Sequence, residues 1–230
     1  MKTKTVVINL DRRTDRLEEF KQNYCWDDYH RFSAFDGKKH INNLNEWDSK
    51  LKESLMQFGG VRQRHLPGAF GCWRSHLSVW DELVMDDDYD SYLIFEDDFR
   101  ATQKFYSELP KILGAIDFSF DIYYIGGRTK ENFSPKRMNE WETVFVNNYK
   151  FFRSKKKKIT GNDFDRGLFS YIITKPGAKK LVDFIQDDLK TDNFVIAVDE
   201  WINKNKQRID VCDVFPHITW SPSAYKSDIR

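Results

Sequence analysis

Short runs of apolar, β-branched residues alternate along this chain with segments whose apolar residues recur every three or four positions. Residues 5–10 (Thr-Val-Val-Ile-Asn-Leu) are predicted to form a strand buried on both faces. Similar runs predict further strands at residues 31–35, 92–95, 121–125, 169–174 and 209–215. Helical spacing predicts helices at residues 15–24, 44–58, 70–84, 176–188 and 200–206, and we expect a hairpin or meander over 142–152.

Strands that alternate with helices indicate an α/β fold with a mainly parallel central sheet flanked by helices. No stretch rich in Pro, Gly or Ser divides the 230 residues, so we expect one domain over residues 1–230. In a sheet of this kind, ligands bind beyond the carboxyl ends of the strands. The residues that directly follow each strand are therefore the first candidates for a functional site.

The composition narrows the class of protein. The formal net charge is only +1, which argues against a nucleic-acid-binding protein because phosphate contacts normally require a basic excess. Three widely spaced cysteines indicate neither a disulfide framework nor a zinc knuckle, and favour a reducing compartment. Without a signal peptide or a membrane-spanning apolar run, we expect a cytoplasmic protein with at most peripheral membrane contact. The basic run at residues 155–158 is either solvated or steers an anionic acceptor or membrane surface.

Three consecutive carboxylates, Glu96, Asp97 and Asp98, directly follow the predicted strand at residues 92–95. Adjacent carboxylates repel one another and lose solvation when they are buried, so a buried strand that ends in them normally supplies a cation site. Oxygen ligands suit the hard ions Mg²⁺ and Mn²⁺, which proteins commonly share with substrate phosphates. The alternative is a solvated acidic loop, and this is the better interpretation for the carboxylates at residues 86–90.

Several motifs occur in an order that is typical of one enzyme family. The early ones are Asn-Leu-Asp-Arg-Arg-Thr-Asp-Arg at 9–16, Phe-Asp-Gly at 35–37, Gly-Ala-Phe-Gly-Cys-Trp-Arg-Ser-His at 68–76 and Leu-Ile-Phe-Glu-Asp-Asp at 93–98. The later ones are Tyr-Ile-Gly at 124–126, Ser-Tyr-Ile-Ile-Thr at 170–174, Asp-Glu-Trp at 199–201 and Ser-Asp-Ile at 227–229. Each motif alone is weak, but together they resemble the family of lipooligosaccharide-biosynthesis and procollagen galactosyltransferases over nearly the whole chain.

The resemblance implies an inverting transferase with the Rossmann-like, A-type glycosyltransferase fold. Its donor would be a UDP-sugar, with galactose expected first and glucose next, and its cofactor Mn²⁺ or Mg²⁺. Its acceptor would be a hydroxyl group of a saccharide or of a collagen-like glycoprotein. Trp220 stands where members of this family often carry Gln before the final Ser, so the acceptor side is left open. The oligomeric state also stays open.

The resemblance also implies roles for individual residues. Those expected near the donor are Asn9, Leu10, Arg12, Asp36, Ser75, His76, Glu96, Asp97 and Gly126. The alternatives are ordinary turns for the early ones and a packed, hydrogen-bonded core histidine for His76. Asp98 is the first choice as metal ligand, with Asp97 second, while Glu96 would fix the ribose or a metal-bound water. His217 is a candidate third ligand or an exposed loop histidine.

Inverting transfer needs a base on the face of the sugar opposite the departing diphosphate, to take the proton of the acceptor hydroxyl. Asp199 is the candidate that the resemblance supplies, and Glu200 is the fallback. The alternative role for Asp199 is a helix N-cap. Two other functions stay open: a catalytically silent binding or assembly module with the same fold, and a metal phosphohydrolase, which would need more His and Asp ligands than this chain offers.

Overall fold

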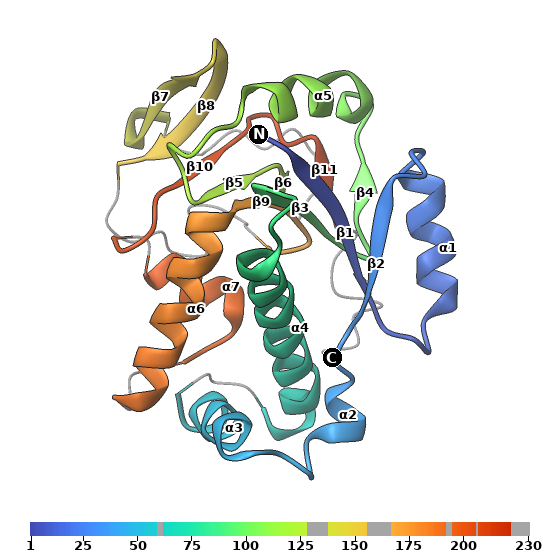
Figure 1. Ribbon diagram of the computed structural model, residues 1–230, viewed down its shortest axis with the longest axis vertical. Helices are drawn as coiled ribbons and strands as arrows, with labels where there is room; N and C mark the ends of the chain where they lie inside the picture. The colour runs from blue at the N-terminus through green and yellow to red at the C-terminus, as the bar shows by residue number, and fades with distance from the viewer. Residues whose placement is uncertain (59–61, 128–137, 156–166, 192–194, 206, 222–230) are drawn as a thin grey trace.

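An eight-stranded sheet crosses the middle of the molecule in the order β2-β1-β3-β9-β5-β10-β8-β7 (Figure 1). The computed structural model describes residues 1–58, 62–127, 138–155, 167–191, 195–205 and 207–221. The strands of this sheet are β1 (Thr3–Asn9), β2 (Tyr29–Ser33), β3 (Ser91–Glu96), β5 (Ile122–Tyr124), β7 (Trp141–Val146), β8 (Tyr149–Ser154), β9 (Ser170–Thr174) and β10 (Val211–Asp213). The predicted strands thus form one layer.

The direction of the strands confirms the prediction of a mainly parallel sheet. β1 pairs in parallel with both β2 and β3, and β10 pairs in parallel with β5. β9 lies antiparallel between β3 and β5, and β8 lies antiparallel between β10 and β7. All strands of this sheet except β8 and β9 therefore share one direction, and their carboxyl ends meet at one edge.

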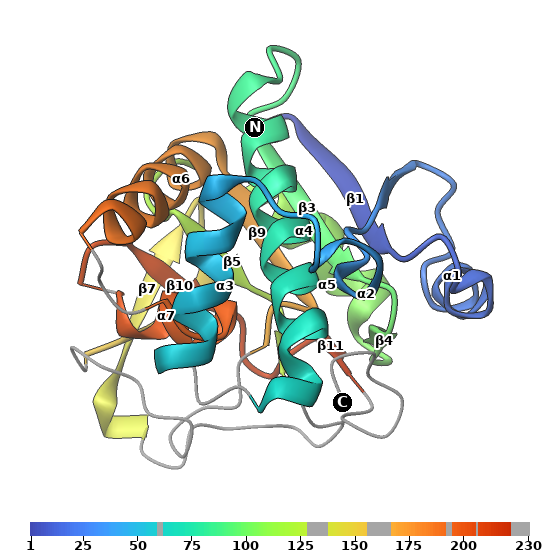
Figure 2. The ribbon, with the colours of Figure 1, turned by 90° about the horizontal axis from the view of Figure 1, so that it is seen from below.

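Successive side chains along the strands pack into two hydrophobic clusters, one on each face of the sheet. Val6 and Ile8 join the cluster under α3 (Glu46–Phe58), α4 (Leu66–Met85), α6 (Lys175–Lys190) and α7 (Val198–Lys204), whereas Val7 joins the cluster under α1 (Thr14–Asn23) and α5 (Phe105–Ala115). Figure 2 shows α3, α4 and α6 lying beside one another on the first face. This sandwich explains why the strands are continuously apolar.

Three local features differ from the sequence-based expectation. Helix α4 begins at Leu66 because Pro67 occupies the first turn, where its missing N–H needs no partner. Helix α5, which contains Pro110, was not predicted. The residues Gly126 and Gly127 form strand β6 rather than a turn, in a small sheet with β4 (Arg100–Ala101) and β11 (Thr219–Trp220).

The hairpin expected over residues 142–152 is confirmed as β7 and β8. Its turn is Asn147-Asn148, and both residues adopt positive φ angles of 44° and 68°. Such angles favour the tight turn that matches the twist of paired strands, and asparagine tolerates them better than most residues. The segments at 128–137 and 156–166, and the motif at 227–229, lie outside the described residues.

Helix α2 (Gly37–His40) crosses the start of α4 at two glycines. A Cβ atom on Gly71 would lie 2.6 Å from the carbonyl oxygen of Phe35, and one on Gly37 would overlap the carbonyl oxygen of Pro67. Backbone atoms cannot move aside as a flexible side chain can. The crossing therefore depends on the absence of both side chains, and it fixes the loop after β2 against α4.

Gly71→Ala is accordingly expected to lower the free energy of unfolding by about 1–3 kcal/mol, the usual range for overpacking. Gly114→Ala is the matched control, because it adds the same methyl group to a helix at a position with nothing within 4 Å. The control should be neutral or stabilising by up to about 1 kcal/mol. Urea unfolding of both variants measures the difference, and equal midpoints would contradict the proposed crowding.

Candidate functional site

A pocket opens at the carboxyl ends of β1 and β3, beside the first turns of α4. Its walls come from the segments after β1, after β2 and after β3, together with one face of α4. Eight of the predicted site residues line it: Leu10, Arg12, Asp36, Ser75, His76, Glu96, Asp97 and Asp98. The position agrees with the general rule for open α/β sheets, in which ligands bind beyond the strand ends.

Asn9 and Asp97 form a clamp between the ends of β1 and β3. The side-chain amide of Asn9 donates to Asp97 Oδ2 (2.7 Å) and to the carbonyl of Arg13, and Asn9 Oδ1 accepts from Arg31 Nε (2.9 Å). Asn9 is 1% exposed and lies behind the pocket wall. Its contacts hold the two strand ends together. This is the structural role in a turn that was the alternative to a role in donor binding.

Arg16 reaches the same carboxylate from helix α1. Its Nη1 donates to Asp97 Oδ1 at 3.1 Å, so both oxygens of Asp97 already accept hydrogen bonds from the protein. Arg16 is 8% exposed and lines the pocket, and its Nη2 has no hydrogen-bond partner among the described residues. A buried guanidinium nitrogen of this kind is suited to an anionic ligand. Arg16 belongs to the motif at residues 9–16, but the family resemblance assigned no role to it.

Asp98 differs from Asp97 in its surroundings. Its Oδ1 is buried and has no hydrogen-bond partner among the described residues. Burial, followed by the charges of Glu96 and Asp97, raises the pKa of Asp98 to about 7. An oxygen of Asp98 without a hydrogen-bond partner, beside the carboxylates of Glu96 and Asp97, provides the oxygen ligands that hard divalent cations prefer. The geometry favours Asp98 over Asp97 as the residue to hold such an ion.

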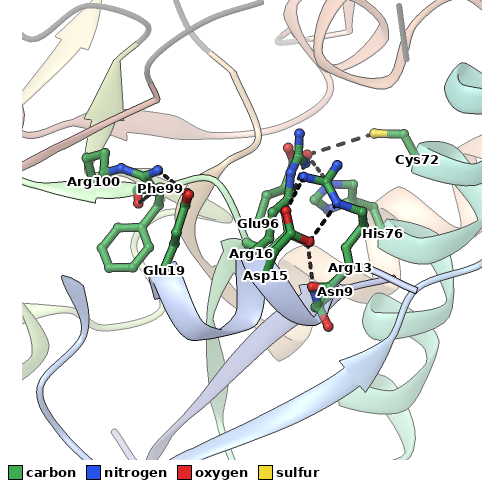
Figure 3. A network of polar contacts seen from close by, with 11 residues as sticks. Asn9, Arg13, Asp15, Arg16, Glu19, Cys72, His76, Glu96, Phe99 and Arg100 are labelled. Carbon is green, nitrogen blue, oxygen red and sulfur yellow. Dashed lines mark hydrogen bonds and ion pairs between the residues drawn. The ribbon is translucent and has the colours of Figure 1, made fainter. Parts of the chain in front are cut away.

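His76 lies at the inner end of the pocket and links it to the core. Its Nε2 lies 3.0 Å from Glu96 Oε1 (Figure 3). Its Nδ1 lies 2.9 Å from the hydroxyl of Tyr171, and this hydroxyl also accepts a hydrogen bond from Trp80 Nε1. His76 is 1% exposed. It is thus a packed, hydrogen-bonded histidine that also lines the pocket. Cys72 Sγ lies 3.9 Å from the same Glu96 oxygen.

Ser75 and Asp36 shape the opposite wall. Ser75 Oγ donates to the Gly71 carbonyl (2.7 Å) and accepts from the Phe35 amide (2.9 Å), so it ties α4 to the segment after β2. Asp36 caps helix α2 by accepting from the Lys38 amide. Both side chains are committed to local structure while they line the pocket.

The pocket is lined by cations as well as by carboxylates. Arg12 Nε donates to Asp36 Oδ2 at 3.0 Å, and Lys38 also lines the pocket. These cations share the pocket with Glu96, Asp97 and Asp98. A ligand that combines negative phosphate with a bound cation would find partners for both on these walls.

Asp199 lies in the first turn of α7, where Ala197 is the N-cap residue. The predicted alternative of an N-cap role for Asp199 is therefore wrong. Its carboxylate accepts from the amide of Glu200 (2.9 Å), and its charge is among those that raise the pKa of the Cys72 thiol, after burial and Glu96. Asp199 is half-buried near the pocket without lining it, whereas Glu200 is exposed.

Two predicted residues lie at the small sheet rather than on the pocket walls. Gly126, in β6, is packed so tightly that a Cβ atom would overlap the hydroxyls of Ser170 and Thr219. His217 precedes β11, is 8% exposed, contacts Phe215 with ring centroids 5.1 Å apart and packs against Gly127. Close packing is a sufficient reason for glycine at 126, and the prediction that His217 is an exposed loop residue is wrong.

The sequence model of glycosyltransferase family 25, described as an LPS biosynthesis protein, matches residues 2–202. The chain belongs to glycosyltransferase family 25. The family match spans all the pocket-lining segments and extends through Asp199. The resemblance inferred from the ordered motifs is thereby confirmed.

Among relatives of this family-25 chain, a putative glycosyltransferase R655 of Acanthamoeba polyphaga mimivirus is 29% identical over 183 residues, covering 78% of this chain and 52% of the relative. Procollagen galactosyltransferase 2 of Homo sapiens is 28% identical over 187 residues, which cover 76% of this chain and 26% of the relative. The chain thus spans about half or less of these relatives. A solved glycosyltransferase involved in glycosylation of the PBCV-1 major capsid superposes with a TM-score of 0.45 and 7% identity, over 100% of this chain and 98% of that one.

Within the described residues, no helix combines the length and the apolar character that a membrane crossing requires.

Proposed function

We propose that this protein is an inverting, metal-dependent hexosyltransferase that works as a single domain. It transfers galactose, or next glucose, from a UDP-sugar to a hydroxyl of a saccharide or a collagen-like glycoprotein. The observation that carries the proposal is the buried, unpartnered Oδ1 of Asp98 in a pocket whose other walls carry Arg12 and Arg16. A nucleoside diphosphate with a divalent cation meets both requirements in one ligand.

Asp98 is the proposed ligand of Mn²⁺ or Mg²⁺, which when bound neutralises the charge that develops on the departing diphosphate. Asp97 is less suited, because Asn9 and Arg16 occupy both its oxygens. The carboxylate of Glu96 contacts His76 Nε2 and Cys72 Sγ, and it is the proposed partner of the ribose or of a metal-bound water. The pocket thus divides its three carboxylates into three roles.

Arg16 is the proposed partner of an anionic diphosphate oxygen through its Nη2. Arg16→Lys keeps the charge and removes the second nitrogen, so we expect the Kd for UDP in the presence of Mn²⁺ to rise about 10- to 100-fold, the value of one charge-assisted hydrogen bond. Arg13→Lys is the control, because Arg13 lies near the same helix and pairs with the exposed Asp15. Calorimetric titration measures both, and equal affinities would contradict this role.

Asp199 is the proposed base that takes the acceptor proton, with Glu200 as the fallback. Its support is its place in the first turn of α7, near enough to Cys72 for its charge to act there. Attack from the opposite face of the sugar requires a base within hydrogen-bond reach of the acceptor hydroxyl on that face, and Asp199 is proposed for this position.

Release of UDP from a panel of UDP-sugars, with and without Mn²⁺, tests the proposed function. We expect turnover that needs the metal and is fastest with UDP-galactose, in the presence of a saccharide or hydroxylysine-containing acceptor. The catalytically silent alternative predicts Mn²⁺-dependent binding of UDP without any release from a UDP-sugar. Absence of both binding and release would contradict the proposed donor pocket itself.

A further inference from the structure

Cys72, His76 and Glu96 bring three different metal-ligating atoms together inside the pocket. Cys72 Sγ, His76 Nε2 and a Glu96 carboxylate oxygen all lie within 4.8 Å of one another. Cys72 and His76 are four residues apart on α4, so they project from the same face of the helix. Glu96, at the end of β3, contacts both of them through Oε1 (Figure 3).

The spacing of these atoms is close to that around a tetrahedral zinc ion. Bonds of about 2.3 Å to sulfur and about 2.0 Å to nitrogen or oxygen place neighbouring ligand atoms about 3.3–3.6 Å apart. The observed separations are 3.0 Å between His76 Nε2 and Glu96 Oε1 and 3.9 Å between Cys72 Sγ and the same oxygen. The third separation, between Cys72 Sγ and His76 Nε2, is at most 4.8 Å, so rotation about the side-chain bonds has to bring these two atoms together by up to about 1.3 Å to close the site.

The partner of the other ring nitrogen supports a metal-binding role for His76. Its Nδ1 lies 2.9 Å from the Tyr171 hydroxyl, which Trp80 Nε1 holds in place at 2.9 Å. The tautomer that donates Nδ1–H to Tyr171 leaves the Nε2 lone pair facing Cys72 and Glu96, where the ion takes the place of the proton that bridges Nε2 and Glu96 in the opposite tautomer. In metal-binding histidines the second ring nitrogen is held in the same way.

We propose that Cys72, His76 and Glu96 form a binding site for a thiophilic divalent cation of the zinc class, which excludes the nucleotide donor when it is bound. Thiolate and imidazole ligands select such ions over Mn²⁺ and Mg²⁺, which prefer oxygen and are assigned to Asp98. The site is therefore distinct from the proposed catalytic metal. Its exclusion of the donor rests on the proposed function, whereas the site itself does not.

Binding at this site exchanges a proton for the ion. The S–H bond of Cys72 breaks, a sulfur–metal bond forms, and the proton leaves to solvent. The three ligands carry two negative charges, so the ion is neutralised and a fourth position opens into the pocket. All three residues line the walls assigned to the donor, and Glu96 can no longer serve the ribose once it ligates the ion.

A Cd²⁺ titration tests the site without any nucleotide, because cadmium–thiolate bonds give an ultraviolet charge-transfer absorption. We expect saturable absorption that Zn²⁺ abolishes by competition and that a large excess of Mn²⁺ does not. Cys72→Ser should remove the absorption, and His76→Gln should weaken the affinity by at least about 100-fold, since even an outer-sphere partner is worth about 10- to 100-fold. Cys25→Ser, which removes an exposed thiol, is the control and should titrate as the parent does.

Undiminished absorption in Cys72→Ser, or unchanged affinity in His76→Gln, would overturn the site. Cys72→Ala repeats the test if the serine variant is unstable. The exclusion is measured separately, by titrating UDP and Mn²⁺ into the parent with and without Zn²⁺, and an unchanged affinity for UDP would overturn it. If the protein binds no UDP under any condition, both the proposed function and the exclusion of the donor by zinc are contradicted. The Cd²⁺ titration still decides whether the metal site exists.

Discussion

Asp199→Asn is expected to lower kcat for sugar transfer by about 10²–10⁴-fold, the range for loss of a general base. Asparagine keeps the size of the side chain and can still accept from the Glu200 amide, which the carboxylate does at 2.9 Å. It cannot take a proton. Because Asp199 does not line the donor pocket, the Kd for UDP with Mn²⁺ should stay at the parental value.

Glu200→Gln is the control for this experiment, since it changes the neighbouring exposed carboxylate in the same way. We expect kcat in this variant to stay within about an order of magnitude of the parent. Initial rates at saturating donor and acceptor, beside calorimetric UDP titrations, separate loss of chemistry from loss of binding. The opposite pattern, with Glu200→Gln inactive and Asp199→Asn active, would assign the base to Glu200.

Asp98→Asn is expected to abolish the Mn²⁺-dependent part of UDP binding and to stabilise the metal-free protein. Its Oδ1 is buried without a hydrogen-bond partner, and its pKa is raised from 3.8 to about 7, first by burial and then by the charges of Glu96 and Asp97. An acid with a raised pKa in the folded state makes the protein less stable as pH rises from 3.8 towards 7. The neutral amide removes this penalty.

The gain from Asp98→Asn should therefore be absent below pH 3.8, grow up to about pH 7 and stay constant above it. We expect a plateau of about 4 kcal/mol in the free energy of unfolding, the equivalent of raising a pKa from 3.8 to about 7 at about 1.4 kcal/mol per pKa unit. Urea unfolding across this pH range in EDTA measures it. With Mn²⁺ and UDP added, the order should reverse, because only the parent gains stability from the bound pair. A variant less stable than the parent at pH 8 in EDTA would contradict the assignment.

Most strands and helices could be predicted because the central strands β1, β3, β5, β9 and β10 are buried on both faces and the longer helices have one apolar face. The position of Glu96-Asp97-Asp98 at a strand end followed from the same patterns. Helix α5 escaped prediction, although Leu109, Ile112 and Ala115 have helical spacing, and Pro110 lies inside it. The small sheet was also missed, because two-residue strands leave no periodic signal.

The site was predicted less completely than the fold. Eight of the predicted residues line the pocket, five of them proposed from motif order and the three carboxylates also from their place after a strand, but their hydrogen bonds join residues up to 95 positions apart, as for His76 and Tyr171. No local pattern shows that both oxygens of Asp97 accept hydrogen bonds from Asn9 and Arg16, while Oδ1 of Asp98 has no hydrogen-bond partner among the described residues. That distinction depends on which side of the turn after β3 each carboxylate faces, which only the folded chain determines.

The pocket described above draws all its walls from residues 8–98, whereas the candidate base belongs to a helix that begins a hundred residues later, at Val198. The two halves of the proposed reaction therefore occupy separate stretches of the gene. Substitutions on the exposed side of α7 are therefore expected to act on the acceptor step and to leave the binding of UDP unchanged.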